Sequence, residues 1–104
     1  PAREGGTVTA RYFMPWKTHP SMAVTGAQCL ASCALIPGTV SDGIVDRPAP
    51  GEALVTIEHA SGRIEVTADY GIDDGAFRLE TAGLLRTARL LAKGSLMVPA
   101  GAWA

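Results

Sequence analysis

A histidine, two hydroxyl residues and a glycine stand close together in the segment 19–27, which reads HPSMAVTGA. The imidazole of His19 can donate a hydrogen bond or exchange a proton near neutral pH. Ser21 and Thr25 add hydroxyl groups, and Gly26 allows a ligand to approach the backbone closely. At the start of a helix these residues suit a carboxylate, because the first turn carries unpaired N–H groups and partial positive charge. The alternative is an ordinary helix start, capped by Ser21 or Thr25.

A second polar group lies in the segment 59–62, which reads HASG. This segment either brings hydrogen-bond donors to a second carboxylate or forms only a turn. Arg86 and Arg89 either bind an anion in a bidentate manner or are solvated or paired with other side chains for structural reasons. We find no metal-ligand spacing, no nucleophile elbow and no phosphate loop, and therefore expect no metal site.

A helix over Ser21–Ile36 is expected to position the first group. The segment contains no charged residue, and a helix that is apolar on nearly all sides is expected to be surrounded by protein. Pro37 and Gly38 should end it. Cys29 and Cys33 are interpreted as small core residues.

Alternation of polar and apolar residues predicts strands elsewhere in the chain. They are Thr7–Met14, Leu54–Glu58, Arg63–Asp69, Ala76–Glu80 and Ser95–Val98, followed by a tail from Pro99. The segment 73–75, which reads DDG, is predicted to be a turn. The local pattern of Leu84–Lys93 favours a helix. Together the segments indicate an α+β fold built on a central apolar helix.

Composition excludes several classes of protein. The chain has 104 residues, of which 47% are hydrophobic, so it is one domain at most and not an intrinsically disordered tail. A net charge of −1 and an aromatic content of 6% argue against nucleic-acid binding. The longest run without charge, Thr18–Ser41, is interrupted by polar residues and prolines, so we expect no membrane association. Without a recognisable secretory signal, a cytoplasmic location is expected.

Three stretches resemble signatures of one enzyme family and occur in the same order. They are HPSMAVTGAQCLASCALIPGTV, IEHASGRIEV and RTARLLAKGSLMVP. Together they are similar to the C-terminal domain of the methylaconitate isomerase and oxalomesaconate tautomerase family. In the second stretch the family usually has proline after the histidine, where this chain has Ala60.

The resemblance implies the diaminopimelate epimerase fold. In that fold a curved, mostly antiparallel sheet wraps around one central helix, and the active site lies between the helix N-termini of two such domains. Residues 1–104 would then form a single partial domain, the C-terminal portion of a two-domain isomerase. The resemblance also implies that Arg86–Leu91 is a strand, against its local helical pattern.

The resemblance further implies proton transfer on small unsaturated di- or tricarboxylates, without a cofactor. One carboxylate would be held on N–H groups by Ser21, Met22, Thr25 and Gly26. The pocket would be lined by His19, Ser61 and Gly62. Ala23 stands where the epimerases have a catalytic cysteine, and the family's proton-transfer groups lie largely outside this chain, so we assign no catalytic residue.

The alternative function is a stand-alone, non-catalytic module that self-associates. Half of a domain would leave an open sheet edge and a partly uncovered helix. We therefore expect either a homo-oligomer or an N-terminal domain outside this chain.

Overall fold

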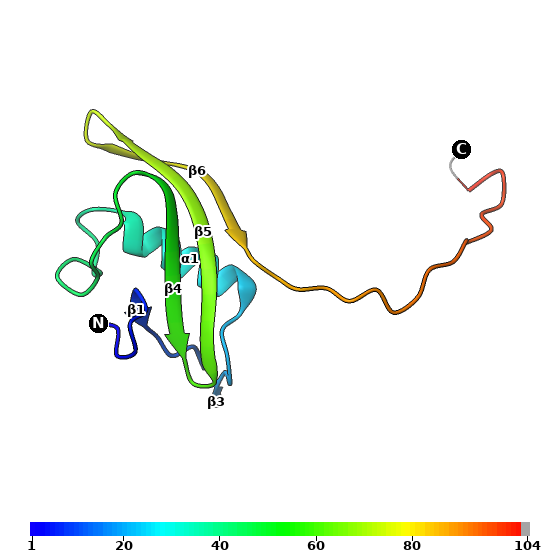
Figure 1. The fold of residues 1–104 in the computed structure, drawn as a ribbon, viewed down its shortest axis with the longest axis horizontal. Coiled ribbons are helices and arrows are strands. Elements are labelled where there is room, and N and C mark those ends of the chain that lie inside the picture. Colours follow the sequence, from blue (N-terminus) through cyan, green and yellow to red (C-terminus); the bar gives the residue numbers. More distant parts are fainter. Residues whose placement is uncertain (103–104) are drawn as a thin grey trace.

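A four-stranded sheet carries a helix on one of its faces (Figure 1). The structure is a computed structural model that describes residues 1–102. The strands of the sheet are β1 (Val8–Thr9), β4 (Gly51–His59), β5 (Gly62–Asp73) and β6 (Ala76–Leu84), in the spatial order β1-β4-β5-β6. The helix, α1 (Val24–Leu35), contacts β4, β5 and β6. This arrangement confirms the predicted α+β class.

Two tight turns join the three long strands. The β4–β5 turn lies at Ala60–Ser61, beside the pair His59↔Gly62. The β5–β6 turn has positive φ at Asp74 (50°) and Gly75 (82°), the requirement of a type I′ turn. Both long pairings are antiparallel, whereas β1 pairs with β4 in parallel, so the sheet is mixed. The turns predicted for the segments 59–62 and 73–75 are therefore confirmed.

The core lies between α1 and one face of the sheet. Leu35 of α1 and Val55, Ile57 and Val66 of the sheet are fully buried. The helix faces the strands with alanines one turn apart, and small side chains permit close packing of helix on sheet. Its buried residues are Ala27, Ala31, Ala34 and Leu35.

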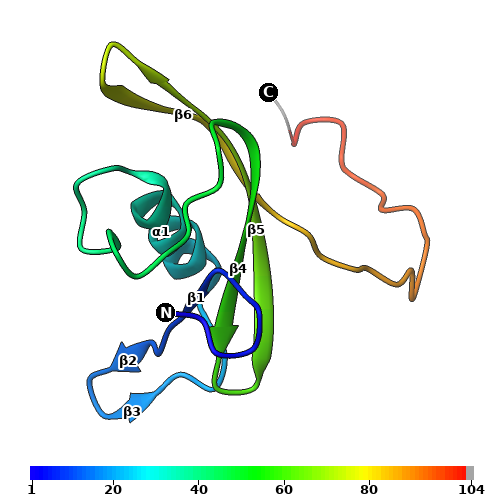
Figure 2. The same ribbon diagram turned by 60° about the vertical axis from the view of Figure 1, so that its left-hand side comes forward.

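The helix is buried on one face only, and its predicted enclosure by protein is wrong for this structure. Val24, Thr25 and Cys29 are exposed, because the sheet reaches α1 from one side (Figure 2). The helix also begins at Val24, three residues later than predicted. The wrapping of a curved sheet around the helix stays a prediction.

The predicted strand Thr7–Met14 is two short strands. Pairing along β4 continues as far as the hydrogen bond from the N–H of Ala10 to the carbonyl of Glu58. β4 ends one residue later, so no strand edge remains for the chain to follow. It turns away instead and forms a hairpin of β2 (Phe13–Met14) and β3 (Lys17–Thr18).

The C-terminal arm, defined here as residues 85–99, contains neither helix nor strand. The expected strands Arg86–Leu91 and Ser95–Val98 are therefore wrong, as is the local helical prediction for Leu84–Lys93. The arm runs away from the body, so no strand edge lies beside it (Figure 1). An isolated helix of this length is marginal in water. Of the predicted tail, residues 103–104 lie outside the described residues.

Candidate functional site

The segment before α1 and the β4–β5 turn are joined by hydrogen bonds. The hydroxyl of Ser61 donates to the carbonyl of Pro20 at 2.6 Å. The hydroxyl of Ser21 lies 3.5 Å from Nε2 of His59, and the N–H of Ser21 donates to Nδ1 of His19 at 3.0 Å. The structure thus brings together His19, Ser21 and Ser61, which the sequence analysis singled out from two distant stretches.

The N-terminus of α1 has no side-chain cap. The N-cap residue is Ala23, which makes no side-chain hydrogen bond, and the first turn contains no acidic residue. The predicted cap by Ser21 or Thr25 is therefore wrong. Ser21 stands two residues before the N-cap and its hydroxyl faces His59, while Thr25 is inside the helix. The positive end of the helix is left without a side chain that neutralises it.

The remaining predicted residues surround this helix start in different ways. Met22 is 9% exposed and belongs to the core, so only its backbone is available to a ligand. Thr25 is exposed in the first turn. The ring of Tyr12 lies 3.4 Å from the position that a Cβ on Gly26 would occupy, so this glycine accommodates a tyrosine. Gly62 is exposed and has φ of +143°, a conformation that favours glycine.

Sequence reasoning missed Tyr12, and it considered His59 only as part of the segment 59–62, without a role of its own. The Tyr12 ring packs edge-to-face against His19, with 6.0 Å between ring centroids. Tyr12 lies in a short connection where no motif pointed to it. His59 lay within the segment 59–62, and its position two residues before Ser61 was the available signal.

A polar hollow of about 230 Å³ adjoins the β4–β5 turn. Arg3 and Arg11 line it together with His59 and Gly62, and the carboxylates of Glu4 and Glu58 in the same lining balance the two guanidinium charges. Neither arginine was a candidate from the sequence, because nothing local indicates that the N-terminal segment reaches the turn. Arg86 and Arg89 lie in the C-terminal arm, outside this hollow.

Glu58 holds the N-terminal segment beside this hollow. Its carboxylate, 4% exposed, accepts hydrogen bonds from the N–H groups of Arg3, Glu4 and Gly6, each at 2.8 Å, and from the hydroxyl of Thr9. The bond from Thr9, followed by those backbone bonds, lowers the pKa of Glu58 to about 2 despite desolvation. Because its lone pairs are occupied and it stays ionised, Glu58 acts as an anchor and not as a general base.

Within residues 1–102, no three histidine, cysteine, aspartate or glutamate side chains are grouped as metal ligands. Over the same residues, no helix is both long and apolar enough to cross a bilayer. The groups gathered at this end of the molecule are hydrogen-bond donors and a helix N-terminus, which can bind and orient an anion.

Comparison with known proteins connects this geometry to a family. A family model described as "PrpF protein" matches residues 4–99. The chain is 35% identical over 103 residues to a 4-oxalomesaconate tautomerase of Pseudomonas putida, and 37% identical over 98 residues to a (4E)-oxalomesaconate Delta-isomerase of a Novosphingobium species. It is 34% identical over 89 residues to a 2-methyl-aconitate isomerase of Cupriavidus necator. These similarities confirm the resemblance drawn from the three sequence stretches.

The matches cover most of this chain but only part of each relative. The first two relatives match 97% and 94% of the chain, and the third matches 84%. The chain spans 27%, 27% and 22% of these three relatives, about a quarter of their length.

Proposed function

Because this chain belongs to the PrpF protein family, we propose that it is the substrate-binding portion of an isomerase or tautomerase. The substrates are small unsaturated di- or tricarboxylates, on which the whole enzyme acts by proton transfer without a cofactor. The chain is the C-terminal portion of a two-domain enzyme located in the cytoplasm. The names of the relatives support the reaction class and the carboxylate substrates.

The observation that carries this proposal is the uncapped start of α1 next to Ser21 and His19. One carboxylate binds N–H groups at this helix start, at Met22, Thr25 and Gly26. Ser21 contributes its hydroxyl, because its own N–H donates to His19. Other polar groups form the wall of the pocket: His19, Ser61 and Gly62.

Such a site favours proton removal beside the bound carboxylate. When a carbon next to a carboxylate loses its proton, negative charge spreads onto the carboxylate oxygens. N–H groups already directed at those oxygens stabilise the charge as it develops, without further reorganisation. The groups that remove and return the proton belong to the rest of the enzyme in this proposal.

The test is a titration of the ¹⁵N-labelled chain with cis-aconitate, a small unsaturated tricarboxylate, followed by amide chemical shifts. We expect the largest changes at Thr25 and Gly26, and none at Gly75 in the distant β5–β6 turn. The trimethyl ester of cis-aconitate, which lacks the charges, is the matched control and should cause no change. Equal shifts with acid and ester, or shifts confined to the C-terminal arm, would refute the proposal.

A second candidate function, a self-associating module, is favoured by the outer face of the sheet. A hollow of about 690 Å³ lies there, lined by Glu52, Leu54 and Asp69 among others, and Leu54 is 49% exposed. Glu52 and Asp69 face each other across β4 and β5, and like charges directly opposite destabilise a sheet. In this candidate function, the C-terminal arm of a second copy covers the hollow, and sedimentation velocity at rising protein concentration tests it.

A further inference from the structure

We propose that His59 is a positioning residue, which orients the hydroxyl of Ser21 toward a carboxylate bound at the start of α1. This inference rests on the proposed carboxylate site and adds a residue outside the predicted set. His59 reaches the site from the end of β4, and its ring lies between two serines that are distant in sequence.

The surroundings of Nδ1 determine where His59 carries its proton. The N–H of Ser61 donates to Nδ1 at 3.3 Å, and a backbone N–H has no acceptor role. The hydroxyl of Ser61 lies 3.4 Å from the same nitrogen, but its hydrogen goes to the carbonyl of Pro20 at 2.6 Å. Nδ1 is therefore an acceptor, and a neutral imidazole then carries its proton on Nε2.

This tautomer sets the direction of the hydrogen bond to Ser21. Nε2 of His59 lies 3.5 Å from Oγ of Ser21, so the ring donates and the hydroxyl oxygen accepts. The hydroxyl hydrogen of Ser21 must then point away from the ring and is free to donate to a ligand. The separation is long, as catalytic hydrogen bonds often are before a ligand is bound.

A second histidine holds the backbone of the same serine. The N–H of Ser21 donates to Nδ1 of His19 at 3.0 Å, the same two-residue pattern that joins Ser61 to His59. Ser21 is thus fixed at its N–H by His19 and at its hydroxyl by His59. Orientation at both points is what a serine needs to present one donor in a defined direction.

The first experiment reads the tautomer directly. Long-range ¹H–¹⁵N correlation spectra of the wild-type chain above neutral pH should show a protonated Nε2 and an unprotonated Nδ1 for His59. A ring protonated only at Nδ1 would overturn the inference, because Nε2 would then accept a hydrogen bond from Ser21 and turn the hydroxyl hydrogen away from any ligand.

The second experiment separates orientation of Ser21 from support of the turn. In His59→Gln the amide NH₂ can replace the Nε2–H donor, whereas in His59→Asn the amide oxygen can replace only the Nδ1 acceptor. We expect cis-aconitate to bind His59→Gln within about threefold of wild type, and His59→Asn about tenfold more weakly, the usual effect of a hydrogen bond that involves a charged group. The reverse order would assign His59 to the turn alone and overturn the inference.

The third experiment tests whether His59 acts through Ser21. In a Ser21→Ala background, His59→Asn should weaken cis-aconitate binding no further, because the hydroxyl that it orients is gone. Melting temperatures of all variants establish that they are folded. A wild-type chain that binds no cis-aconitate would refute the proposed function and this inference together, whereas equal binding by wild type and His59→Asn would refute only the role of His59.

Discussion

At the scale of single residues, the candidate site depends on side chains that neither bind nor react. Glu58 is the clearest example, since its carboxylate accepts three backbone N–H groups of the N-terminal segment. Those bonds keep Arg3 in the hollow beside His59. Loss of the Glu58 carboxylate therefore affects both the stability of the fold and the charge next to the site.

We predict that Glu58→Gln is less stable than wild type at neutral pH. An amide presents one oxygen and an NH₂ group, so at least one backbone N–H loses its acceptor and faces another donor. Urea unfolding monitored by far-ultraviolet circular dichroism measures the effect as a lower midpoint. Glu65→Gln, at an exposed position on the neighbouring strand β5, is the matched control and should leave the midpoint unchanged.

The lowered pKa of the Glu58 carboxylate predicts that the stability of the fold depends on pH. The pKa of Glu58 is about 2 in the folded chain, against an ordinary value of 4.5. Because the folded pKa is the lower one, the stabilisation is fully present above pH 4.5 and is lost as the pH falls from there toward 2. As the pH falls from 4.5 toward 2, wild type should therefore lose more stability than Glu58→Gln. Parallel pH profiles of the two proteins would contradict this assignment.

A substitution at Gly6 tests by steric clash whether Glu58 holds the N-terminal segment in place. A Cβ at this position would lie 2.8 Å from Cγ of Glu58 and 3.0 Å from the carbonyl oxygen of Thr56. Backbone on one side leaves little room to relax, so Gly6→Ala should destabilise the fold by about 1–3 kcal/mol. Gly94→Ala, where nothing lies within 4 Å of the added carbon, is the control. Urea midpoints that are equal for the two variants would show that the N-terminal segment is not held as described.

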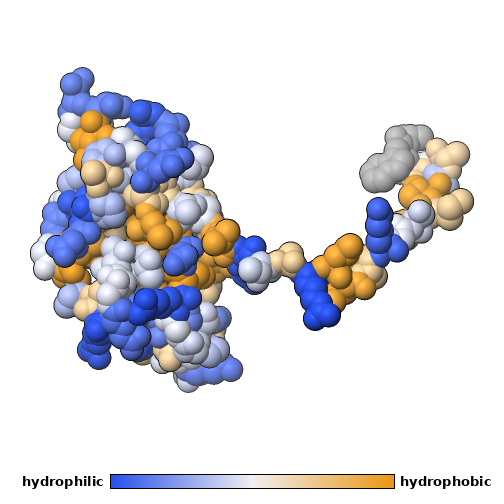
Figure 3. Space-filling view, in the orientation of Figure 1, coloured by the Kyte–Doolittle hydropathy of each residue, from blue (hydrophilic) through white to orange (hydrophobic). Residues whose placement is uncertain are grey.

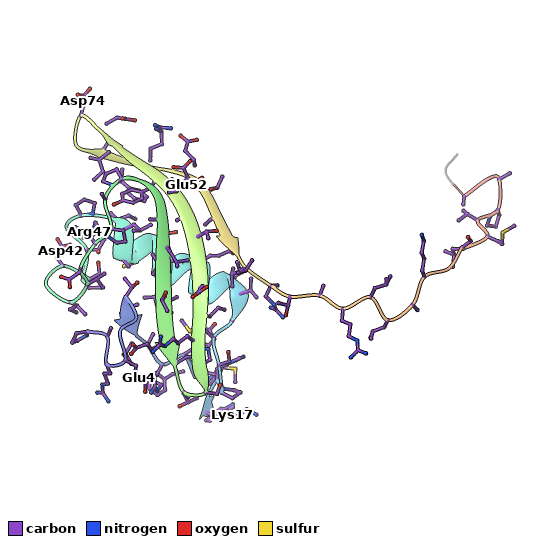
Figure 4. The ribbon with its side chains drawn as sticks, in the orientation of Figure 1. Glu4, Lys17, Asp42, Arg47, Glu52 and Asp74 are labelled. Carbon is purple, nitrogen blue, oxygen red and sulfur yellow. The ribbon has the colours of Figure 1, made fainter. Side chains whose placement is uncertain are left out.

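At the scale of elements, the two ends of α1 differ in whether a side chain stabilises them. At the C-terminal end, the guanidinium of Arg47 donates to the carbonyls of Ala34 (3.3 Å) and Ile36 (3.1 Å) and pairs with Asp42 (Figure 4). The hydrogen bond from Arg47 is the main cause that lowers the pKa of Asp42. Positive charge stabilises this end of a helix, whereas the N-terminal end at Ala23 lacks a corresponding side chain.

Replacement of Arg47 by methionine should therefore destabilise the helix end. Methionine keeps most of the apolar stem but donates to neither carbonyl, and we expect a loss of about 1–2 kcal/mol. Arg78→Met is the control, because Arg78 forms an ion pair with Asp73 at 2.9 Å on the exposed surface, where such pairs contribute about 0–1 kcal/mol. Thermal unfolding of both variants measures the difference. A larger loss in Arg78→Met would contradict the capping role of Arg47.

Elements defined by local chemistry were predictable from the sequence, and elements defined by a distant partner were not. The β5–β6 turn follows from Asp74 and Gly75, which tolerate positive φ. The candidate residues His19 and Ser61 were singled out from the short segments HPSMAVTGA and HASG. The path of Thr7–Met14 instead depends on where β4 ends. The contact of Tyr12 with Gly26 depends on the β2–β3 hairpin, for which no local signal was found.

At the scale of the whole molecule, the C-terminal arm separates this chain from a compact domain. The radius of gyration is 18.3 Å, whereas a compact domain of about 100 residues has about 13 Å. The arm exposes Leu85, Leu90 and Leu91 at 76%, 79% and 86% (Figure 3). The arm extends on the side of the sheet opposite α1 (Figure 2). The hollow lined by Glu52 and Asp69 belongs to this outer face of the sheet.

The arm and the hollow are complementary in charge as well as in hydrophobicity. The arm carries Arg86, Arg89 and Lys93 among its leucines, while the outer face presents Glu52 and Asp69 around Leu54. A cationic, apolar segment on that face would relieve the repulsion between the opposed carboxylates and cover Leu54. If the module self-associates as the second candidate function states, this contact is the one that we expect to hold two copies together.

Charge reversal with rescue tests this contact. The double variant Arg86→Glu/Arg89→Glu should be monomeric at a concentration where wild type is dimeric, because its arm is repelled by the outer face. Adding Glu52→Lys and Asp69→Lys restores opposite charges and should restore the dimer. Sedimentation velocity at two salt concentrations measures both effects, and salt should weaken the wild-type dimer because the paired groups are exposed. A wild-type chain that stays monomeric at every concentration would refute self-association through this surface.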